Sequence, residues 1–290
     1  MTAGTDESFL ELPAPAKLNL FLHVTGRRAD GYHTLQTVFQ FIDCCDRIRM
    51  RRRSDGFIRR VGGNEQIPPE ADLICRAAHL LKSRGHCALG ADLAVEKRIP
   101  VGGGLGGGSS DAATVLLGLN YLWQIGLTHA ELAGLGLQLG ADVPVFVQGA
   151  ASWAEGVGEC LTPMTLPEPV YLVLVPPCHV ATGRIFGDPE LTRNSEPIKI
   201  ADFVAGRGRN DCLPVVRRHY PEVAKALDWL DQSAPARLTG TGACVFAEFS
   251  DVEAARGVLA KVPPGLTGFV SKGLNRSPLH DRLAGLTSAN

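Results

Sequence analysis

The chain contains 290 residues, of which 45% are hydrophobic and 20% are charged, and its formal net charge is -1. This length suffices for one large or two ordinary domains with a buried core. Because the charges nearly balance, no overall field favours nucleic acid or an anionic membrane as a partner, and we expect neither.

The first residues, MTAGTDESFLELPAPA, lack the basic start and apolar core of a signal peptide. The longest apolar strand-like run, at 170–175, is too short to cross a bilayer. Eight cysteines are scattered along the chain without CxxC, HExxH or another zinc spacing. We therefore expect a cytoplasmic protein with reduced, buried thiols and no metal site built from its own side chains.

The N-terminal region begins with a predicted strand at 17–24, in which an apolar face alternates with a mixed face. The apolar face contains Leu18, Leu20, Leu22 and Val24, and the mixed face contains Lys17, Asn19, Phe21 and His23. A polar turn, GRRADG, leads to a second strand at about 33–43, so the two strands predict a hairpin-like unit.

Residues 47–60, RIRMRRRSDGFIRR, predict another hairpin, which turns at Asp55 and Gly56. We assign the arginines at 47–60 to a solvated sheet face rather than to a nucleic-acid patch, because aromatic stacking partners are sparse. A helix at 72–82 and a strand at about 92–99 follow. Lys97 lies on a mostly apolar row of that strand, and an isolated lysine there most often extends to water.

The segment PVGGGLGGGSSDAA, at 100–113, has six glycines between positions 102 and 108. Ser109 and Ser110 are good N-cap residues for a helix that runs to about Trp123. A strand, a glycine loop and a helix N-terminus in this order present backbone N–H groups to an anion, which predicts a site for nucleotide phosphates. Neither the dinucleotide fingerprint nor the P-loop pattern fits, because the preceding strand is charged and no Gly-Lys-Ser/Thr closes the segment.

A capping box at Thr128 and Glu131 predicts a helix to about 139, with Gly140 as its C-cap. Asp142 follows on a connection in which Pro144 is expected to keep the backbone extended. From the residues alone, an aspartate after a helix is more often a turn or cap residue than a catalytic one.

The C-terminal region predicts a helix at 220–230. A strand at 244–249, a helix from Asp251 and a strand at 267–272 predict a βαβ-like unit. The TGTGA sequence at 239–243 predicts a tight turn before the first of these strands.

Three segments resemble, in order and spacing, the motifs of the GHMP kinases, which phosphorylate small-molecule hydroxyl groups. They are PAPAKLNL at 13–20, PVGGGLGGGSSDAA at 100–113 and LTGTGACVF at 238–246. GRRADGYHTLQTVFQFID at 26–43 and LGADVPVF at 139–146 are similar to one branch, whose substrate is 4-diphosphocytidyl-2-C-methyl-D-erythritol. The resemblance extends from about Pro13 to His280.

The resemblance implies an α/β (α+β) fold with a catalytic cleft between two domains. These are an N-terminal ATP-binding domain at 1–160 and a C-terminal ferredoxin-like βαβ domain at 161–290. It further implies transfer of the γ-phosphoryl group of ATP, bound with Mg²⁺, to the 2-hydroxyl of that substrate, in non-mevalonate isoprenoid precursor biosynthesis. A homodimer is left open.

By resemblance, Asp142 matches the family's general base and Lys17 matches the lysine paired with it. The positions that match ATP-binding residues are Lys97, Pro100, Val101, Gly102, Gly103, Gly104, Leu105, Gly106, Gly107, Gly108, Ser109 and Ser110. The positions that match substrate-binding residues are Asn19, Tyr32, His33, Thr182 and Phe186. The turn at 239–243 is expected beside the glycine segment as a wall of the site.

The chain departs from the family at Ala71-Asp72-Leu73, where family members commonly have Asp-Asn-Leu. Because Asp72 cannot donate hydrogen bonds as an amide does, we expect a difference in nucleotide affinity or adenine selectivity. Two alternatives stay open: another GHMP kinase acting on a different small alcohol, and a non-catalytic nucleotide-binding protein of the same fold. The presence of both Lys17 and Asp142 argues against the second.

Overall fold

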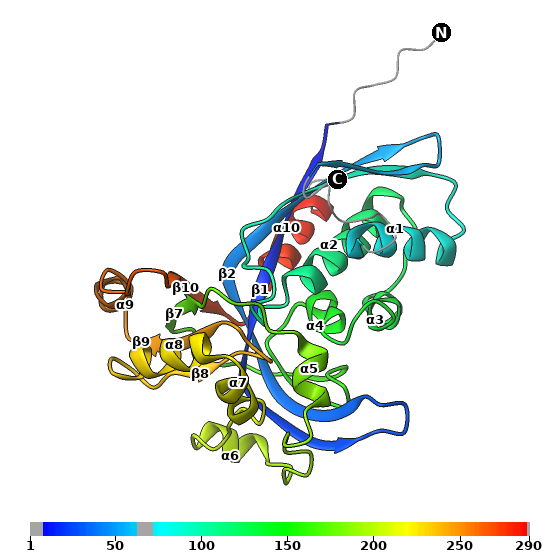
Figure 1. The fold of residues 1–290 in the computed structure, drawn as a ribbon. Helices are drawn as coiled ribbons and strands as arrows, with labels where there is room; N and C mark the ends of the chain where they lie inside the picture. Colours follow the sequence, from blue (N-terminus) through cyan, green and yellow to red (C-terminus); the bar gives the residue numbers. More distant parts are fainter. Residues whose placement is uncertain (1–7, 63–71, 289–290) are drawn as a thin grey trace.

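The computed structural model describes residues 8–62 and 72–288, which form one mixed sheet of ten strands with helices packed around it (Figure 1). The strands are β1 (Leu10–Arg27), β2 (His33–Arg53), β3 (Ile58–Gly62), β4 (Gly90–Glu96), β5 (Ser152–Glu155), β6 (Cys160–Pro163), β7 (Val170–Val175), β8 (Arg237–Leu238), β9 (Val245–Phe249) and β10 (Thr267–Leu274). The helices are α1 (Leu73–Arg84), α2 (Gly107–Leu122), α3 (His129–Leu137), α4 (Val143–Gln148), α5 (Thr182–Gly187), α6 (Ile200–Val204), α7 (Leu213–His219), α8 (Pro221–Asp231), α9 (Val252–Leu259) and α10 (Pro278–Thr287).

The long antiparallel pair β1 and β2 connects the two halves of the molecule. In Figure 1, α1 to α4 and α10 lie on one side of this pair, and β7, β9 and β10 with α8 and α9 lie on the other. β10 joins the halves by pairing with β2 as well as with β7. The sheet is therefore continuous from β3 to β8.

β1 contributes to three hydrophobic cores. Leu12 belongs to the core that includes the buried faces of α1 and α2, Leu18 belongs to a central core, and Leu22 belongs to the core of the C-terminal half. The pairing register with β2 shifts between Asn19 and Leu22, and such an irregularity turns side chains relative to the pleat. The predicted single apolar face at 18–24 is therefore divided between two cores.

The prediction of a hairpin at 47–60 is wrong. β2 continues to Arg53, and its last seven residues pair with β4, while β3 pairs with β4 in parallel. β4 therefore lies between β2 and β3. The turn at Asp55 and Gly56 exists, but it carries the chain past β4 instead of back along β2. Local turn chemistry could not reveal this, because the partner strand lies some forty residues away.

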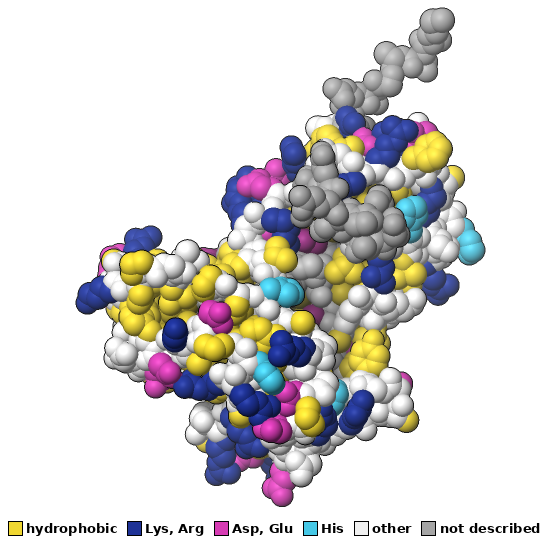
Figure 2. Space-filling model, in the orientation of Figure 1, with side chains coloured by type: hydrophobic (Ala, Val, Ile, Leu, Met, Phe, Trp, Pro, Cys, Tyr) yellow, Lys and Arg dark blue, Asp and Glu magenta, His cyan; other side chains and the backbone are white. Residues whose placement is uncertain are grey.

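The arginines of this region lie on the sheet as the alternation predicts, but Arg51 and Arg53 are not simply solvated. Ile48 and Met50 are buried. Arg51 and Arg53 pair with Asp92 of β4 at 2.7 and 2.8 Å, and Asp92 is only 2% exposed. On the face shown in Figure 2, basic side chains lie among acidic ones.

The helices around the glycine segment differ from expectation at their ends. α2 begins at Gly107, and its N-cap is Gly106 in the left-handed region (φ 73°), so Ser109 and Ser110 lie inside the first turn instead of capping it. The capping box of α3 is present, but Gln138 rather than Gly140 is the C-cap. Pro144 lies in the first turn of α4, where proline needs no N–H partner, instead of in an extended segment.

The C-terminal prediction is confirmed. α8 buries the stripe of Val223, Ala226, Leu227 and Leu230. Asp251 caps α9 by accepting a hydrogen bond from the N–H of Ala254 at 2.8 Å. β9 and β10 both pair antiparallel with β7, so β7 lies between the two strands of the βαβ-like unit. All eight cysteines are free; Cys75, Cys212 and Cys244 are buried and Cys160 is exposed, so the prediction of buried thiols holds only in part.

Asp92 provides a test of how the β2–β4 pairing is stabilised. Burial alone would raise the pKa of Asp92, but the hydrogen bonds and charges of Arg51 and Arg53 hold it below its usual value. A carboxylate with a depressed pKa stabilises the fold above its unfolded-state pKa, and this stability is lost as the pH falls through the folded-state value. We expect Asp92→Asn to lower the free energy of unfolding by about 1–3 kcal/mol at neutral pH, and the deficit to shrink below about pH 4.

Urea unfolding at neutral pH and below about pH 4 measures this loss of unfolding free energy. The matched control is Asp228→Asn, because Asp228 is 62% exposed in its pair with Arg217 and should change stability by less than about 1 kcal/mol. An equal deficit for the two variants, or one that persists in acid, would contradict the assignment.

Candidate active site

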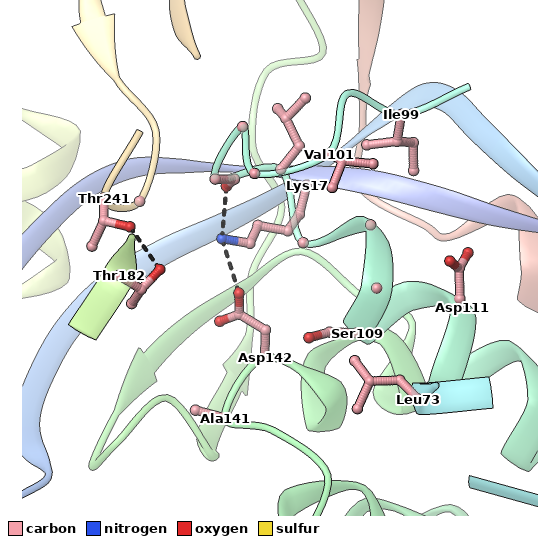
Figure 3. Close-up of a pocket in the computed structure, with 18 of the residues that line it drawn as sticks. Lys17, Leu73, Ile99, Val101, Ser109, Asp111, Ala141, Asp142, Thr182 and Thr241 are labelled. Carbon is pink, nitrogen blue, oxygen red and sulfur yellow. Dashed lines mark hydrogen bonds and ion pairs between the residues drawn. The ribbon is translucent and has the colours of Figure 1, made fainter. Parts of the chain in front are cut away.

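A cavity of about 650 Å³ lies where the two halves of the chain meet. Its walls come from β1, β2, the starts of α1, α2 and α4, from α5 and from the turn at 240–241. Figure 3 shows Lys17, Asp142 and Ser109 around one part of it, Thr182 and Thr241 on one side, and Leu73, Ile99 and Asp111 on the other. The cavity therefore has a charged centre and two distinct ends.

The residues at 100–106, which we call the glycine loop, form the roof of this centre. Gly102, Gly104 and Gly106 have φ angles of 72°, 76° and 73°, a region that side chains rarely allow. A Cβ atom on Gly104 would lie 2.3 Å from the carbonyl oxygen of Thr239. Leu105, which interrupts the glycines, is buried in the central core and anchors the loop. The glycines are thus required by backbone conformation and by close packing.

The turn at 239–243 supports the glycine loop from the C-terminal half. The N–H groups of Ala243 and Cys244 donate to the carbonyl oxygens of Gly102 and Gly103 at 3.1 and 3.0 Å. The hydroxyl of Thr239 donates to the carbonyl oxygen of Gly104 at 3.3 Å. This segment lies against the loop, as the resemblance implies for a wall of the site.

The start of α2 opens into the cavity and suits an anion. Gly106 caps the helix without a side chain, and the first backbone bond inside the helix runs from the N–H of Ser110 to the oxygen of Gly106 at 2.9 Å. The N–H groups of the first turn before Ser110 have no partner within the helix. Together with the helix dipole they fit a phosphate group.

Lys17 is a buried cation at the centre of the cavity. Its ammonium group donates to Asn19 Oδ1 at 2.5 Å and to the carbonyl oxygen of Gly104 at 3.2 Å. It also lies 3.2 Å from Asp142 Oδ2 (Figure 3). The Lys17 side chain is 3% exposed, whereas that of Asp142 is 35% exposed. The Asp142 carboxylate is therefore accessible from the cavity, while the buried ammonium group of Lys17 pairs with one of its oxygen atoms.

Asn19 is oriented by a residue that the sequence reasoning missed. Its amide nitrogen donates to Thr37 Oγ1 at 3.0 Å, and the Thr37 hydroxyl in turn donates to the carbonyl oxygen of Phe21. This chain points the amide oxygen of Asn19 at Lys17. Thr37 lies on β2 beside β1, and alternation within 33–43 was the one signal that could have indicated it.

Lys97 does not extend freely to water. Its ammonium group pairs with Asp46 of β2 and, at 2.8 Å, with Asp111 of α2. Asp46 is wholly buried and Asp111 is 5% exposed. Neither carboxylate was singled out from the sequence, because an isolated acid on a strand or in a helix gives no signal of a buried partner.

The far end of the cavity is lined by Phe186 and Thr182 of α5. Phe186 stacks on His33 with ring centroids 5.1 Å apart and an interplanar angle of 28°. Burial and the charges of Arg193 and Arg27 lower the pKa of His33. The Arg193 guanidinium donates to His33 Nε2 at 3.1 Å, so the neutral ring carries its proton on Nδ1. The hydroxyls of Thr182 and Thr241 lie 3.1 Å apart (Figure 3).

Of the residues proposed from the sequence, most line the cavity: Lys17, Asn19, Lys97, Pro100, Val101, Gly102, Gly103, Gly104, Leu105, Gly106, Gly107, Gly108, Ser109, Asp142, Thr182 and Phe186. Ser110 lies behind this wall and is buried, and His33 lies behind Phe186. Tyr32 is 62% exposed and does not line the cavity.

Asp72 has a structural role at the edge of the cavity. It caps α1 by accepting from the N–H of Ile74 at 3.1 Å, and it pairs with Arg60 of β3 at 3.0 Å. Asp72 lines the cavity, whereas Ala71 lies outside the described residues. Within 8–62 and 72–288 no group of three or more His, Cys, Asp or Glu side chains could hold a metal ion. No helix in these same ranges combines the length and apolar character needed to span a membrane.

Comparison with known proteins places these features in a family. Residues 72–150 match the GHMP kinases N terminal domain, and residues 196–264 match the GHMP kinases C terminal domain. A relative from Alkalilimnicola ehrlichii named 4-diphosphocytidyl-2-C-methyl-D-erythritol kinase is 56% identical over 94% of this chain and 94% of its own length. A relative of the same name from Nitrosococcus oceani is 55% identical over 93% of this chain and 97% of its own.

Among solved structures, a 4-(cytidine 5'-diphospho)-2C-methyl-D-erythritol kinase has a TM-score of 0.78 and 31% identity, and the match covers 91% of this chain and 99% of that one. The chain is thus similar to these kinases in both sequence and fold over almost its whole length. The chain belongs to the GHMP kinases, and within them to the family of 4-diphosphocytidyl-2-C-methyl-D-erythritol kinases.

Proposed function

We propose that the chain transfers the γ-phosphoryl group of ATP to the 2-hydroxyl of 4-diphosphocytidyl-2-C-methyl-D-erythritol, giving ADP and the 2-phosphate. The observation that carries this proposal is the Lys17–Asp142 pair at 3.2 Å, beside a glycine loop and an open helix N-terminus. The names of the relatives supply the acceptor. We also propose that the reaction serves isoprenoid precursor synthesis in the cytoplasm.

Asp142 is suited to receive the proton of the attacking hydroxyl. Its accessible carboxylate faces the cavity, and general bases act within hydrogen-bond reach of the proton they take. Lys17 orients that carboxylate and adds positive charge beside the transferring group. Since phosphoryl transfer depends mainly on positioning and charge stabilisation, this arrangement supplies what the reaction needs.

The glycine loop and the first turn of α2 are suited to hold the ATP phosphates through backbone N–H groups. Mg²⁺ would enter with the nucleotide and neutralise phosphate charge, because the described residues offer it no cluster of their own. The acceptor's cytosine ring would lie against Phe186, whose other face is supported by His33.

We further propose that the chain is divided into domains at 1–160 and 161–290. The two family matches, at 72–150 and 196–264, fall on opposite sides of this boundary. The cavity is lined from both sides of it, as expected for a catalytic cleft between domains.

The proposed base is tested by Asp142→Asn. The amide keeps the shape of the side chain but cannot accept the proton, so we expect kcat to fall by about 10²- to 10⁴-fold. The assay follows ADP release with Mg-ATP and the cytidylated substrate, with mevalonate, homoserine and galactose as competing acceptors. The control Asp228→Asn changes a distant exposed carboxylate.

Turnover of the cytidylated substrate alone, lost in Asp142→Asn, supports both the acceptor and the base. Turnover of another acceptor would replace our substrate and leave the kinase assignment. Full activity in the variant would exclude Asp142 as the base.

The role of the glycine loop is tested by Gly104→Ala. A methyl group there would strain the backbone and approach the oxygen of Thr239 to 2.3 Å, so the loop must shift away from its phosphate-binding shape. Backbone strain of this kind amounts to about 1–3 kcal/mol, and we expect the KM for ATP to rise at least about tenfold. Gly134→Ala on α3 is the control, because a Cβ there meets nothing within 4 Å. An unchanged KM would mean that the loop does not hold the phosphates.

The acceptor end is tested by Phe186→Leu. Loss of the stacked ring should raise the KM for the cytidylated substrate by about fivefold, as expected for about 1 kcal/mol of aromatic contact. The KM for ATP should not change. Phe57→Leu, at an exposed ring that does not line the cavity, controls for the loss of an aromatic side chain. A rise in the KM for ATP instead would place the nucleotide at this end.

A further inference from the structure

Asp46, Lys97 and Asp111, which we call the clamp, come from three elements that meet beside the glycine loop. Asp46 belongs to β2, Lys97 follows the last residue of β4, and Asp111 lies near the start of α2. The ammonium of Lys97 bridges the two carboxylates at their Oδ2 atoms. The sequence patterns indicated none of these contacts, and the mechanism proposed above does not use them.

The clamp connects the two ends of the glycine loop. On the entering side, Asp46 Oδ1 accepts the N–H groups of Arg98 and Ile99 at 2.5 and 2.8 Å, directly before the loop. On the leaving side, Lys97 reaches Asp111 at 2.8 Å, directly after the first turn of α2. The separation of the loop's ends is therefore fixed by charged groups.

The clamp is remote from the reacting centre. In Figure 3, Asp111 and Ile99 lie on the opposite side of the start of α2 from Lys17 and Asp142. Asp46 has no exposed surface, so it cannot touch a nucleotide directly. Lys97 and Asp111 line the cavity, so the clamp can affect ATP through its own charge as well as through the position of the loop.

The charges within the clamp do not balance when both carboxylates are ionised. Asp46 accepts hydrogen bonds from two backbone N–H groups and from Lys97, whereas Asp111 Oδ1 has no hydrogen-bond partner among the described residues. Burial, opposed by the charge of Lys97 and assisted by that of Asp46, raises the pKa of Asp111 to about 7. Burial lowers the pKa of Lys97, but the two carboxylates outweigh burial and hold it above its usual value.

Among the residues that the structure describes, a second charged pair lines this end of the cavity. Asp72 at the start of α1 and Arg60 of β3 lie 3.0 Å apart. Asp111 is thus connected through Lys97 to Asp46 of β2, while the Asp72–Arg60 pair carries no net charge. A proton on Asp111 makes the clamp neutral, and loss of that proton leaves it with one negative charge beside the phosphate site.

We propose that Asp46, Lys97 and Asp111 are positioning residues of the glycine loop. Nucleotide affinity then depends on Lys97 bridging the two carboxylates and on the clamp having no net charge. The inference rests on the proposed function only in taking the loop as the nucleotide's phosphate site. Release of the Asp111 proton to solvent adds negative charge near the phosphates and opposes their binding. Affinity should therefore fall as the pH rises through neutrality, without a matching change in the chemical step.

The test measures the Kd for Mg-ADP by calorimetry between about pH 6 and about pH 8.5, with no acceptor present. We expect the Kd of the unaltered chain to rise about three- to tenfold over this range, as one added charge near a protein surface predicts. Asp111→Asn keeps the side chain's shape but cannot ionise, so its Kd should stay near the low-pH value. Asp228→Asn, which removes an exposed carboxylate that does not line the cavity, is the control and should retain the rise. Titration of ADP itself is common to all three proteins.

Steady-state kinetics separate positioning from chemistry. The KM for ATP should follow the Kd, whereas kcat at saturating ATP should have the same pH profile in the unaltered chain and in Asp111→Asn. Lys97→Met should weaken Mg-ADP binding about tenfold, and Lys97→Arg should restore part of it. If Lys97→Met does not fold, the comparison of Asp111→Asn with the unaltered chain decides alone.

Equal pH slopes for the unaltered chain and Asp111→Asn would overturn the proposal, as would an effect confined to kcat. A slope that depends on Asp111 in a chain that transfers no phosphate to the cytidylated substrate would sustain the clamp and overturn the proposed function.

Discussion

The contacts of the Lys17 ammonium group hold the site together. A buried cation is tolerated only when oxygen atoms surround it, and here these come from the strand itself (Asn19), the glycine loop (Gly104) and the start of α4 (Asp142). The same requirement therefore fixes the relative positions of three segments that are distant in the sequence. The group that we propose supports the chemistry also holds the site together, so replacing Lys17 would disturb both.

The glycine loop shows how a flexible sequence becomes rigid in its context. Leu105 is buried in the central core, and the N–H groups of Ala243 and Cys244 donate hydrogen bonds to the carbonyl oxygens of Gly102 and Gly103. Each glycine with a positive φ angle is thus held by neighbours rather than left free. A loop held in this way presents its N–H groups to an anion without first having to be ordered, which favours binding.

Features with local signals could be predicted from the sequence. The capping box at Thr128 and the apolar stripe of α8 depend on neighbours within a few residues, and both are present. The prediction of a hairpin at 47–60 is wrong because β4, which is distant in the sequence, lies between β2 and β3 and pairs with both. The extended backbone predicted at Pro144 is wrong, because proline is equally compatible with the first turn of a helix, where it lies in α4.

The same distinction applies to the site. The resemblance indicates Lys17 and Asp142, but no local pattern indicates Asp46 or Asp111, because the role of a buried acid depends on a partner that is distant in the sequence. The role of Thr37 could not be predicted either, because it depends on a hydrogen bond from Asn19 on the neighbouring strand.

The long strands β1 and β2 also decide how the molecule can come apart. Leu22 and Val24 of β1 complete the core of the C-terminal half, while Leu279 of α10 belongs to the core of the N-terminal half. β10 pairs with β2 through Gly273 and Leu274. Each half therefore lends apolar surface to the other, and a fragment cut near residue 160 would expose surface that it cannot bury alone. The chain is built to unfold as one cooperative unit, and large opening of the cleft by separation of the halves is disfavoured by the same shared strands.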